Sequence, residues 1–142
     1  MHQKNLRICF GLMVTALFFL TTACQTLKTC PPDEILAKRA AEMMTARENQ
    51  DWAKVYRYLD PEYRKGISKS SFVAMDRNLL YADGVVESVE IAESGKEARV
   101  KVKYTMVVTS FGVEVPDHVE TQTWVKVGRR WYYQMKSDSP MG

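Results

Sequence analysis

The residues with the greatest capacity for chemistry in this chain are His118 and its neighbour Asp117. A histidine beside a carboxylate is suited to proton transfer, with the imidazole as the general base. However, neighbouring residues of a strand point to opposite faces, and this pair follows Pro116 in a stretch that connects two strand patterns. We therefore expect His118 to be an exposed loop residue and not a catalytic base.

Metal and phosphate chemistry have no matching motif in the chain. Zinc sites need several Cys or His ligands at short spacings, and His118 with Cys30 cannot form one. The sequence has no glycine-rich phosphate loop and no Gly-x-Ser-x-Gly nucleophile turn. We expect no metal, no cofactor and no catalytic residue, and hence a protein that is not an enzyme.

The first 23 residues contain the three regions of a secretory signal peptide. Lys4 and Arg7 precede an apolar run over residues 8–20, and small residues follow the run. This run is shorter than the roughly 20 apolar residues of a transmembrane helix, and threonines end it. We expect residues 1–23 to be cleaved, so that the mature chain begins at Cys24.

Residues 20–24, Leu-Thr-Thr-Ala-Cys, resemble a bacterial lipoprotein lipobox, although Thr21 stands where that family has a leucine-like residue. The resemblance implies that Cys24 carries a diacylglyceryl thioether and an N-acyl group such as palmitate, which anchor the protein to a membrane. Gln25 follows instead of an aspartate, which implies the outer membrane, facing the periplasm, if the organism is Gram-negative. Thr21 and Ala23 equally suit ordinary signal peptidase, and that alternative gives a soluble exported protein.

The charge balance gives no reason to expect nucleic acid as a partner. The chain carries 20 Lys and Arg against 17 Asp and Glu, a formal net charge of +3. Lys4 and Arg7 lie in the signal, so the formal net charge of the mature chain falls to +1. No single-sign field remains to attract nucleic acid or an acidic substrate.

Cys30 lies in a short tether, residues 24–32, between the anchor and the domain. It has no internal partner, because Cys9 leaves with the signal and Cys24 is modified. Cys30 is therefore either free or bridged to another chain, and we expect a bystander thiol.

Residues 33–136 form one domain, in which helical patterns come first, and residues 137–142 are a tail. Apolar residues recur there at three- and four-residue spacings, with capping residues in front. The patterns predict helices over residues 33–49 and 52–59, a turn at 61–64, and a third helix that begins after Ser68 or Ser70 and carries Phe72, Met75 and Leu79.

After Asp83-Gly84 the hydrophobic period changes to two, which is typical of strands. The alternation predicts a meander of four strands, over residues 85–91, 98–108, 119–127 and 131–135. Helices followed by antiparallel strands indicate an α+β fold, with the helices packed on one face of the sheet.

Three segments make the domain resemble a nuclear transport factor 2-like (SnoaL-like, cystatin-like) cone domain. They are residues 51–61, the helix with Phe72, and the closing hairpin with Trp124, Gly128 and Trp131. The resemblance covers residues 33–135 and implies a curved four-stranded antiparallel sheet whose concave face the N-terminal helices cover. This fold hosts isomerases, dehydratases, cyclases, ligand binders and interaction modules, so it leaves the activity open.

The two sides of the predicted sheet carry different candidate residues. Tyr104, Met106, Thr121 and Thr123 are assigned to the concave side, where they could orient a ligand in a mostly apolar pocket. The alternative is that they fill the core with their polar tips hydrogen-bonded. The outer side is assigned four residues of a candidate protein interface: Arg99, Lys101, Lys103 and Trp124. The alternative is that this side is a solvated polar face.

The expected function is a membrane-anchored, non-catalytic interaction or assembly module of the cell envelope, which pairs with an envelope protein or forms a homodimer. One alternative is a carrier or sensor of a small apolar ligand in the cone, suggested by Tyr104, Met106, Met43 and Met44. The other is a lyase or isomerase of the same fold. It would need a buried acid or histidine, and the sequence does not visibly place one there.

Overall fold

A computed structural model of the chain describes residues 31–75 and 77–135. The predicted signal peptide, the predicted lipidation site Cys24, Cys30 and the tail over residues 137–142 lie outside the described residues. The described residues form four helices and then four strands, which make one antiparallel sheet in chain order. The α+β class predicted from the sequence is confirmed.

The first helix, α1 (Pro32–Glu48), agrees with the predicted range to within one residue. Proline at its first position and acidic residues in its first turn, Asp33 and Glu34, favour a helix start. Its buried side recurs at helical spacing and includes Leu36, Ala40, Met43, Met44 and Arg47. Arg47 is the one charged residue of this buried stripe.

Three short helices follow, and each begins at a side chain that accepts backbone N–H groups. These helices and their caps are α2 (Trp52–Tyr58) with Asp51, α3 (Pro61–Gly66) with Asp60, and α4 (Lys69–Ala74) with Ser68. The last helix ends earlier than predicted, and Leu79 belongs to the first strand. Arg77 donates from Nη2 to the carbonyl oxygen of Phe72 at 2.6 Å, and so satisfies an acceptor at the end of α4.

The strands are β1 (Leu79–Ile91), β2 (Glu97–Val108), β3 (Val113–Val127) and β4 (Arg130–Tyr133). The first strand begins before its predicted start, because Asp83 and Gly84 form a bulge inside it and do not precede it. Asp83 has φ 55° there, and the backbone N–H of Gly84 donates to Oε1 of Glu48 at 2.6 Å. Turn-type residues thus stand within a strand because the end of α1 approaches the backbone closely.

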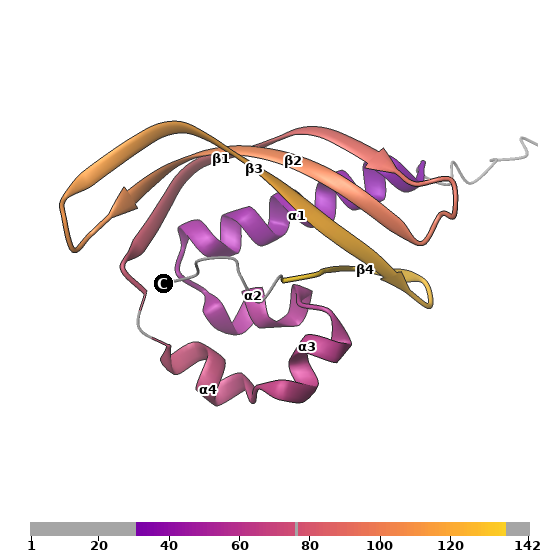
Figure 1. Cartoon of the computed structure of the whole chain (residues 1–142), viewed down its shortest axis with the longest axis horizontal. Helices are drawn as coiled ribbons and strands as arrows, with labels where there is room; N and C mark the ends of the chain where they lie inside the picture. Colours follow the sequence, from indigo (N-terminus) through magenta and orange to yellow (C-terminus); the bar gives the residue numbers. More distant parts are fainter. Residues whose placement is uncertain (1–30, 76, 136–142) are drawn as a thin grey trace, which may run out of the picture.

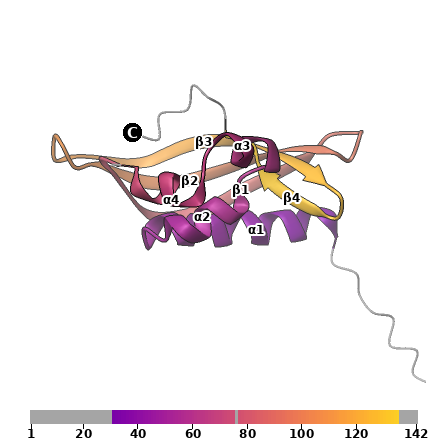
Figure 2. The same cartoon turned by 90° about the horizontal axis from the view of Figure 1, so that it is seen from below.

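The helices lie together on one side of the sheet (Figure 1), and α1 runs along β1 (Figure 2). We call the face toward the helices the inner face, and the opposite face the outer face. Between the layers lies one hydrophobic core, which includes Val55, Leu59, Phe72, Val100 and Val102. The backbone N–H of Asp60 donates to the carbonyl oxygen of Tyr133 at 2.9 Å. This bond attaches the junction of α2 and α3 to β4, the edge strand.

The predicted faces of β3 are reversed in the structure. Trp124 is 0% exposed and Gln122 is also buried, whereas Thr121 and Thr123 pair with Lys101 and Arg99 on the outer face. The prediction placed the side of β3 that carries the valines toward the core. In a strand this choice decides the position of every side chain, because neighbouring residues point to opposite faces. The burial of Gln122 is made possible by hydrogen bonding, since its Oε1 accepts from Nε1 of Trp124 at 3.1 Å.

Candidate functional site

A polar cluster lies between α1 and the inner face of the sheet. Nη1 of Arg47, on α1, donates to Oε2 of Glu120, on β3, at 3.1 Å, and the two side chains are 2% and 20% exposed. The hydroxyl of Tyr104 donates to the same Oε2 at 3.1 Å, and that of Tyr133 donates to Oε1 at 3.2 Å. One helix and three strands, counting Tyr104 on β2 and Tyr133 on β4, therefore meet at a single carboxylate.

The electrostatics of this cluster keep Arg47 and Glu120 charged. Burial alone would raise the pKa of Glu120, but the charge of Arg47 and the hydrogen bonds from its three donors lower it below the ordinary value. Burial likewise opposes the charge of Arg47, yet Glu120 holds the pKa of the guanidinium above its usual range. Burial, followed by the charge of Glu120, raises the pKa of Tyr104, which therefore stays protonated as a donor.

Aromatic rings surround the guanidinium of Arg47. Its Cζ atom lies 5.5 Å from the ring centroid of Tyr81 and 5.3 Å from that of Tyr133, distances at which a cation is attracted to a ring. The Nε atom of Arg47 is buried and has no hydrogen-bond partner among the described residues. Because Glu120 already accepts three hydrogen bonds and its pKa is lowered, it is a poor general base, and the cluster is suited to holding α1 on the sheet.

The structure separates Asp117 and His118, as their adjacency predicts, but it places both within β3 and not in a loop. The His118 ring lies on the inner face, with its centroid 5.2 Å from that of Tyr104. Asp117 is on the outer face, where Oδ1 lies 3.2 Å from Nζ of Lys103. The expectation of an exposed loop histidine was therefore wrong.

The described residues contain no group of His, Cys, Asp and Glu side chains that could hold a metal ion.

The four residues assigned to a ligand pocket are not brought together. Tyr104 and Met106 lie on the inner face, where Tyr104 is buried and Met106 packs against the core. Thr121 and Thr123 lie on the outer face. The prediction that all four share one side of the sheet is wrong, for the reason given for β3.

The outer face carries the predicted cations but not the predicted aromatic. Arg99, Lys101 and Lys103 are at least partly exposed there, while Trp124 is in the core. Nζ of Lys101 lies 3.5 Å from Oε2 of Glu87 on β1, so this face carries a polar contact between neighbouring strands. Trp124 cannot anchor an interface from a fully buried position.

Exposed valines take the place that Trp124 was expected to have. Lys103 pairs in register with Val85 on one side and Val119 on the other, and these valines are 48% and 44% exposed. Within the described part of the chain, no element covers this face. The outer face therefore combines partly exposed apolar side chains with charges of both signs.

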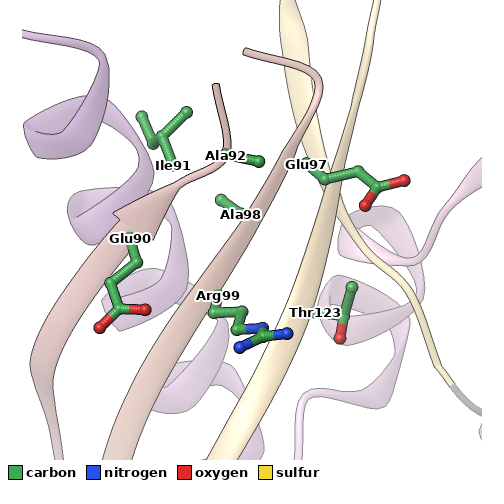
Figure 3. A pocket seen from close by; sticks show the side chains of 7 residues that line it. All are labelled: Glu90, Ile91, Ala92, Glu97, Ala98, Arg99 and Thr123. Carbon is green, nitrogen blue, oxygen red and sulfur yellow. The ribbon is translucent and has the colours of Figure 1, made fainter. Parts of the chain in front are cut away.

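An open pocket of about 370 Å³ lies where β1 turns into β2 (Figure 3). Glu90, Arg99 and Thr123 are register partners on three successive strands, and Figure 3 shows Arg99 between the other two. Glu97 also lines the pocket, so that one cation stands among two carboxylates. This mixed lining suits a polar protein contact at the end of the outer face better than a small ion of either sign.

Sequence reasoning missed Arg47, Glu120 and Tyr133 as a cluster. Arg47 follows Met43 by four residues and Met44 by three, so it falls on the apolar stripe of α1. A lone arginine on such a stripe needs a buried partner, and this was the available signal. The partner itself could not be found without the correct face of β3.

No family model matches this chain, and no curated protein matches it. Among the helices that the structure describes, none combines the length and the apolar character needed to cross a bilayer.

Proposed function

We propose that this protein is a lipid-anchored, non-catalytic interaction module of the cell envelope, and that it binds its partner through the outer face of the sheet. The observation that carries the proposal is the row of Val85, Lys103 and Val119, in which two half-exposed valines flank a lysine. Protein interfaces combine apolar contacts with polar and charged ones, and this row places two half-exposed valines beside a lysine on one surface.

The anchor proposed for this module is the lipid on Cys24, which follows from the resemblance of residues 20–24 to a lipobox. Several acyl chains at about 0.8 kcal/mol per buried methylene hold a small domain on a bilayer essentially permanently. Gln25 after the cysteine supports the outer membrane, facing the periplasm, in a Gram-negative organism.

The finer fold proposed is the nuclear transport factor 2-like cone, with the helices as a lid on the concave face of the sheet. The order of helices and meander strands supports it, as does the closing hairpin between β3 and β4 with Trp124 and Trp131 buried. The interior of such a cone is where enzymes and carriers of this fold place their reactive or binding groups.

The interior contacts favour binding at the surface over the two alternatives. Met43, Met44 and Tyr104, which suggested a carrier of an apolar ligand, are buried in the core cluster. A lyase or isomerase has two observations in its favour, because Glu120 is an acid and His118 a histidine on the inner face. The carboxylate oxygens of Glu120 already accept three hydrogen bonds from protein donors, and a substrate would first have to displace these donors.

Site-specific photocrosslinking in cells tests the proposed interface. A photoreactive residue in place of Thr121, which is exposed on the outer face, should give one discrete adduct with an envelope protein or a second copy. The same residue in place of Lys65, exposed on α3, is the matched control and should give none.

The adduct should also depend on the valine row. Replacing the two exposed valines by cations, Val85→Lys and Val119→Lys, removes the apolar surface of the row. It should abolish the Thr121 adduct while the protein remains folded. No adduct from Thr121 under any condition, or equal adducts from Thr121 and Lys65, would contradict the proposal.

A further inference from the structure

A second surface feature lies away from the outer face, where α1, α2, α3 and β4 meet. It is an open cleft of about 450 Å³, a size within the range of small-ligand sites. Two tyrosines line it, Tyr58 and Tyr132. The remaining lining residues are all cations: Arg39, Lys54, Arg57, Arg64 and Arg130. We call this feature the basic cleft.

Two cations of the basic cleft, Arg39 and Arg64, pack on the ring of Tyr132. The Cζ atoms of Arg39 and Arg64 each lie 5.5 Å from the centroid of the Tyr132 ring, and that of Arg39 also lies 4.7 Å from the Tyr58 ring. Nε of Arg39 donates to the carbonyl oxygen of Trp131. Both guanidinium groups are therefore positioned by packing and not left free in solvent.

These positioned groups retain unused donors. In the residues that the structure describes, the Nη groups of Arg39 donate no hydrogen bond, and Nε of Arg64 is buried without a partner. The buried Nε atoms of Arg47 and Arg77, outside the cleft, also have no partner among the described residues, so the Nε of Arg64 is not specific to the cleft. The Nη groups of Arg39 are the donors that an acceptor from outside the described chain can use.

The charges of the basic cleft are also uncompensated. Among the described residues, no carboxylate lies within 4.0 Å of any of its five cations, whereas Lys101 and Lys103 on the outer face are each paired. Glu42 accepts a hydrogen bond from the hydroxyl of Tyr58 at 3.2 Å but reaches none of the cations. Five like charges around one hollow repel one another, and a multivalent anion would relieve that repulsion.

We propose that the basic cleft is a binding site for a phosphate-type polyanion, such as a pyrophosphate or phosphomonoester group. Guanidinium forks match the oxygen geometry of phosphate, and four of the five cations are arginines. The group comes either from a soluble phosphorylated compound or from the phosphomonoester head group of an anionic lipid. Neither source requires the outer-face interaction, so the two proposals fail separately.

Binding of inorganic pyrophosphate to the purified full chain in mild detergent, measured by isothermal titration calorimetry, tests the basic cleft. Arg57→Gln with Arg130→Gln removes two exposed cations of the cleft that make no hydrogen bond to described residues, so the fold should be unaffected. Arg129→Gln is the matched control, because Arg129 is the exposed neighbour of Arg130 and does not line the cleft. We expect one site per chain, weakened at least about tenfold by the double substitution and unchanged by the control.

Soluble short-chain lipids distinguish the two sources of the phosphate group. If the source is lipid, short-chain phosphatidic acid should bind the detergent-solubilised chain and short-chain phosphatidylcholine should not, with competition by pyrophosphate and loss in the double variant. If the source is soluble, pyrophosphate should bind and phosphatidic acid should add nothing. No pyrophosphate binding, or equal binding by the double variant and the Arg129→Gln control, would overturn the proposal.

Discussion

Nη1 of Arg47 lies 3.1 Å from Oε2 of Glu120, so an ion pair joins the longest helix to the third strand inside the domain. The same carboxylate accepts hydrogen bonds from Tyr104 and Tyr133. Because the guanidinium is almost fully removed from water, each partner depends on the other for compensation of its charge.

Arg47→Met should destabilise the domain strongly, because it leaves Glu120 as a largely buried carboxylate without its cation. Breaking a buried pair from one side typically costs about 3–5 kcal/mol of unfolding free energy, which urea denaturation measures. Lys65→Met is the control, since the Lys65–Glu62 pair is exposed and should contribute less than about 1 kcal/mol. Equal losses in the two variants would contradict the buried role of Arg47.

Glu120 should make the stability depend on acid pH. Its folded pKa is lowered from the ordinary value of 4.5, so its contribution is fully present above that value and is lost as pH falls through the folded pKa. Glu120→Gln should therefore be less stable than the parent at pH 7. Between pH 5 and pH 3 its free energy of unfolding should fall less, because the parent takes up about one more proton on unfolding in that range. A parallel fall of both proteins with pH would refute this linkage.

Tyr104 should make the free energy of unfolding depend on pH in the alkaline range. Burial and the charge of Glu120 raise its pKa above the ordinary value of 10.0, so its contribution is present below pH 10 and decreases as pH rises toward the folded pKa. Tyr104→Phe should remove one such group, so the slope of unfolding free energy above pH 10 should become shallower by at most about 1.4 kcal/mol per pH unit. Urea denaturation at a series of pH values checks it, and an unchanged slope would speak against the hydroxyl's role.

Gly84→Ala should destabilise the bulge in β1. A Cβ atom at this position would lie 3.0 Å from Oε1 of Glu48 and 3.2 Å from Cβ of Met44, so the end of α1 would have to move. Overpacking of this kind typically costs about 1–3 kcal/mol. Gly66→Ala is the matched control, because a Cβ there meets nothing within 4 Å, and its melting temperature should not fall. A similar loss in both variants would mean that close approach to α1 does not explain the glycine.

The helices could be predicted because their signals are local. The apolar stripe of α1 and the cap at Asp51 depend only on neighbours in sequence, and both are found as expected. The extra length of β1 could not be predicted, because Asp83 and Gly84 look like a turn until Glu48 is known to bind the backbone there. That contact joins residues far apart in the chain.

The candidate site was less predictable than the fold for a related reason. Two polar residues of β3, Glu120 and Gln122, face the core because Arg47 and Trp124 form hydrogen bonds with them. Such pairing between distant residues cannot be detected from the hydrophobic period of the sequence. The alternation of β3 therefore gave the wrong face. The basic cleft collects cations from three helices and one strand, so no segment of the sequence shows it as a charge run.

Native mass spectrometry of the protein extracted from its own membranes in mild detergent tests the central claim most directly. We predict a chain that begins at Cys24, carries the added mass of acyl groups, and remains bound to a protein subunit, either a partner or a second copy. An unacylated chain that is detected alone would contradict both the lipid anchor and the interaction module.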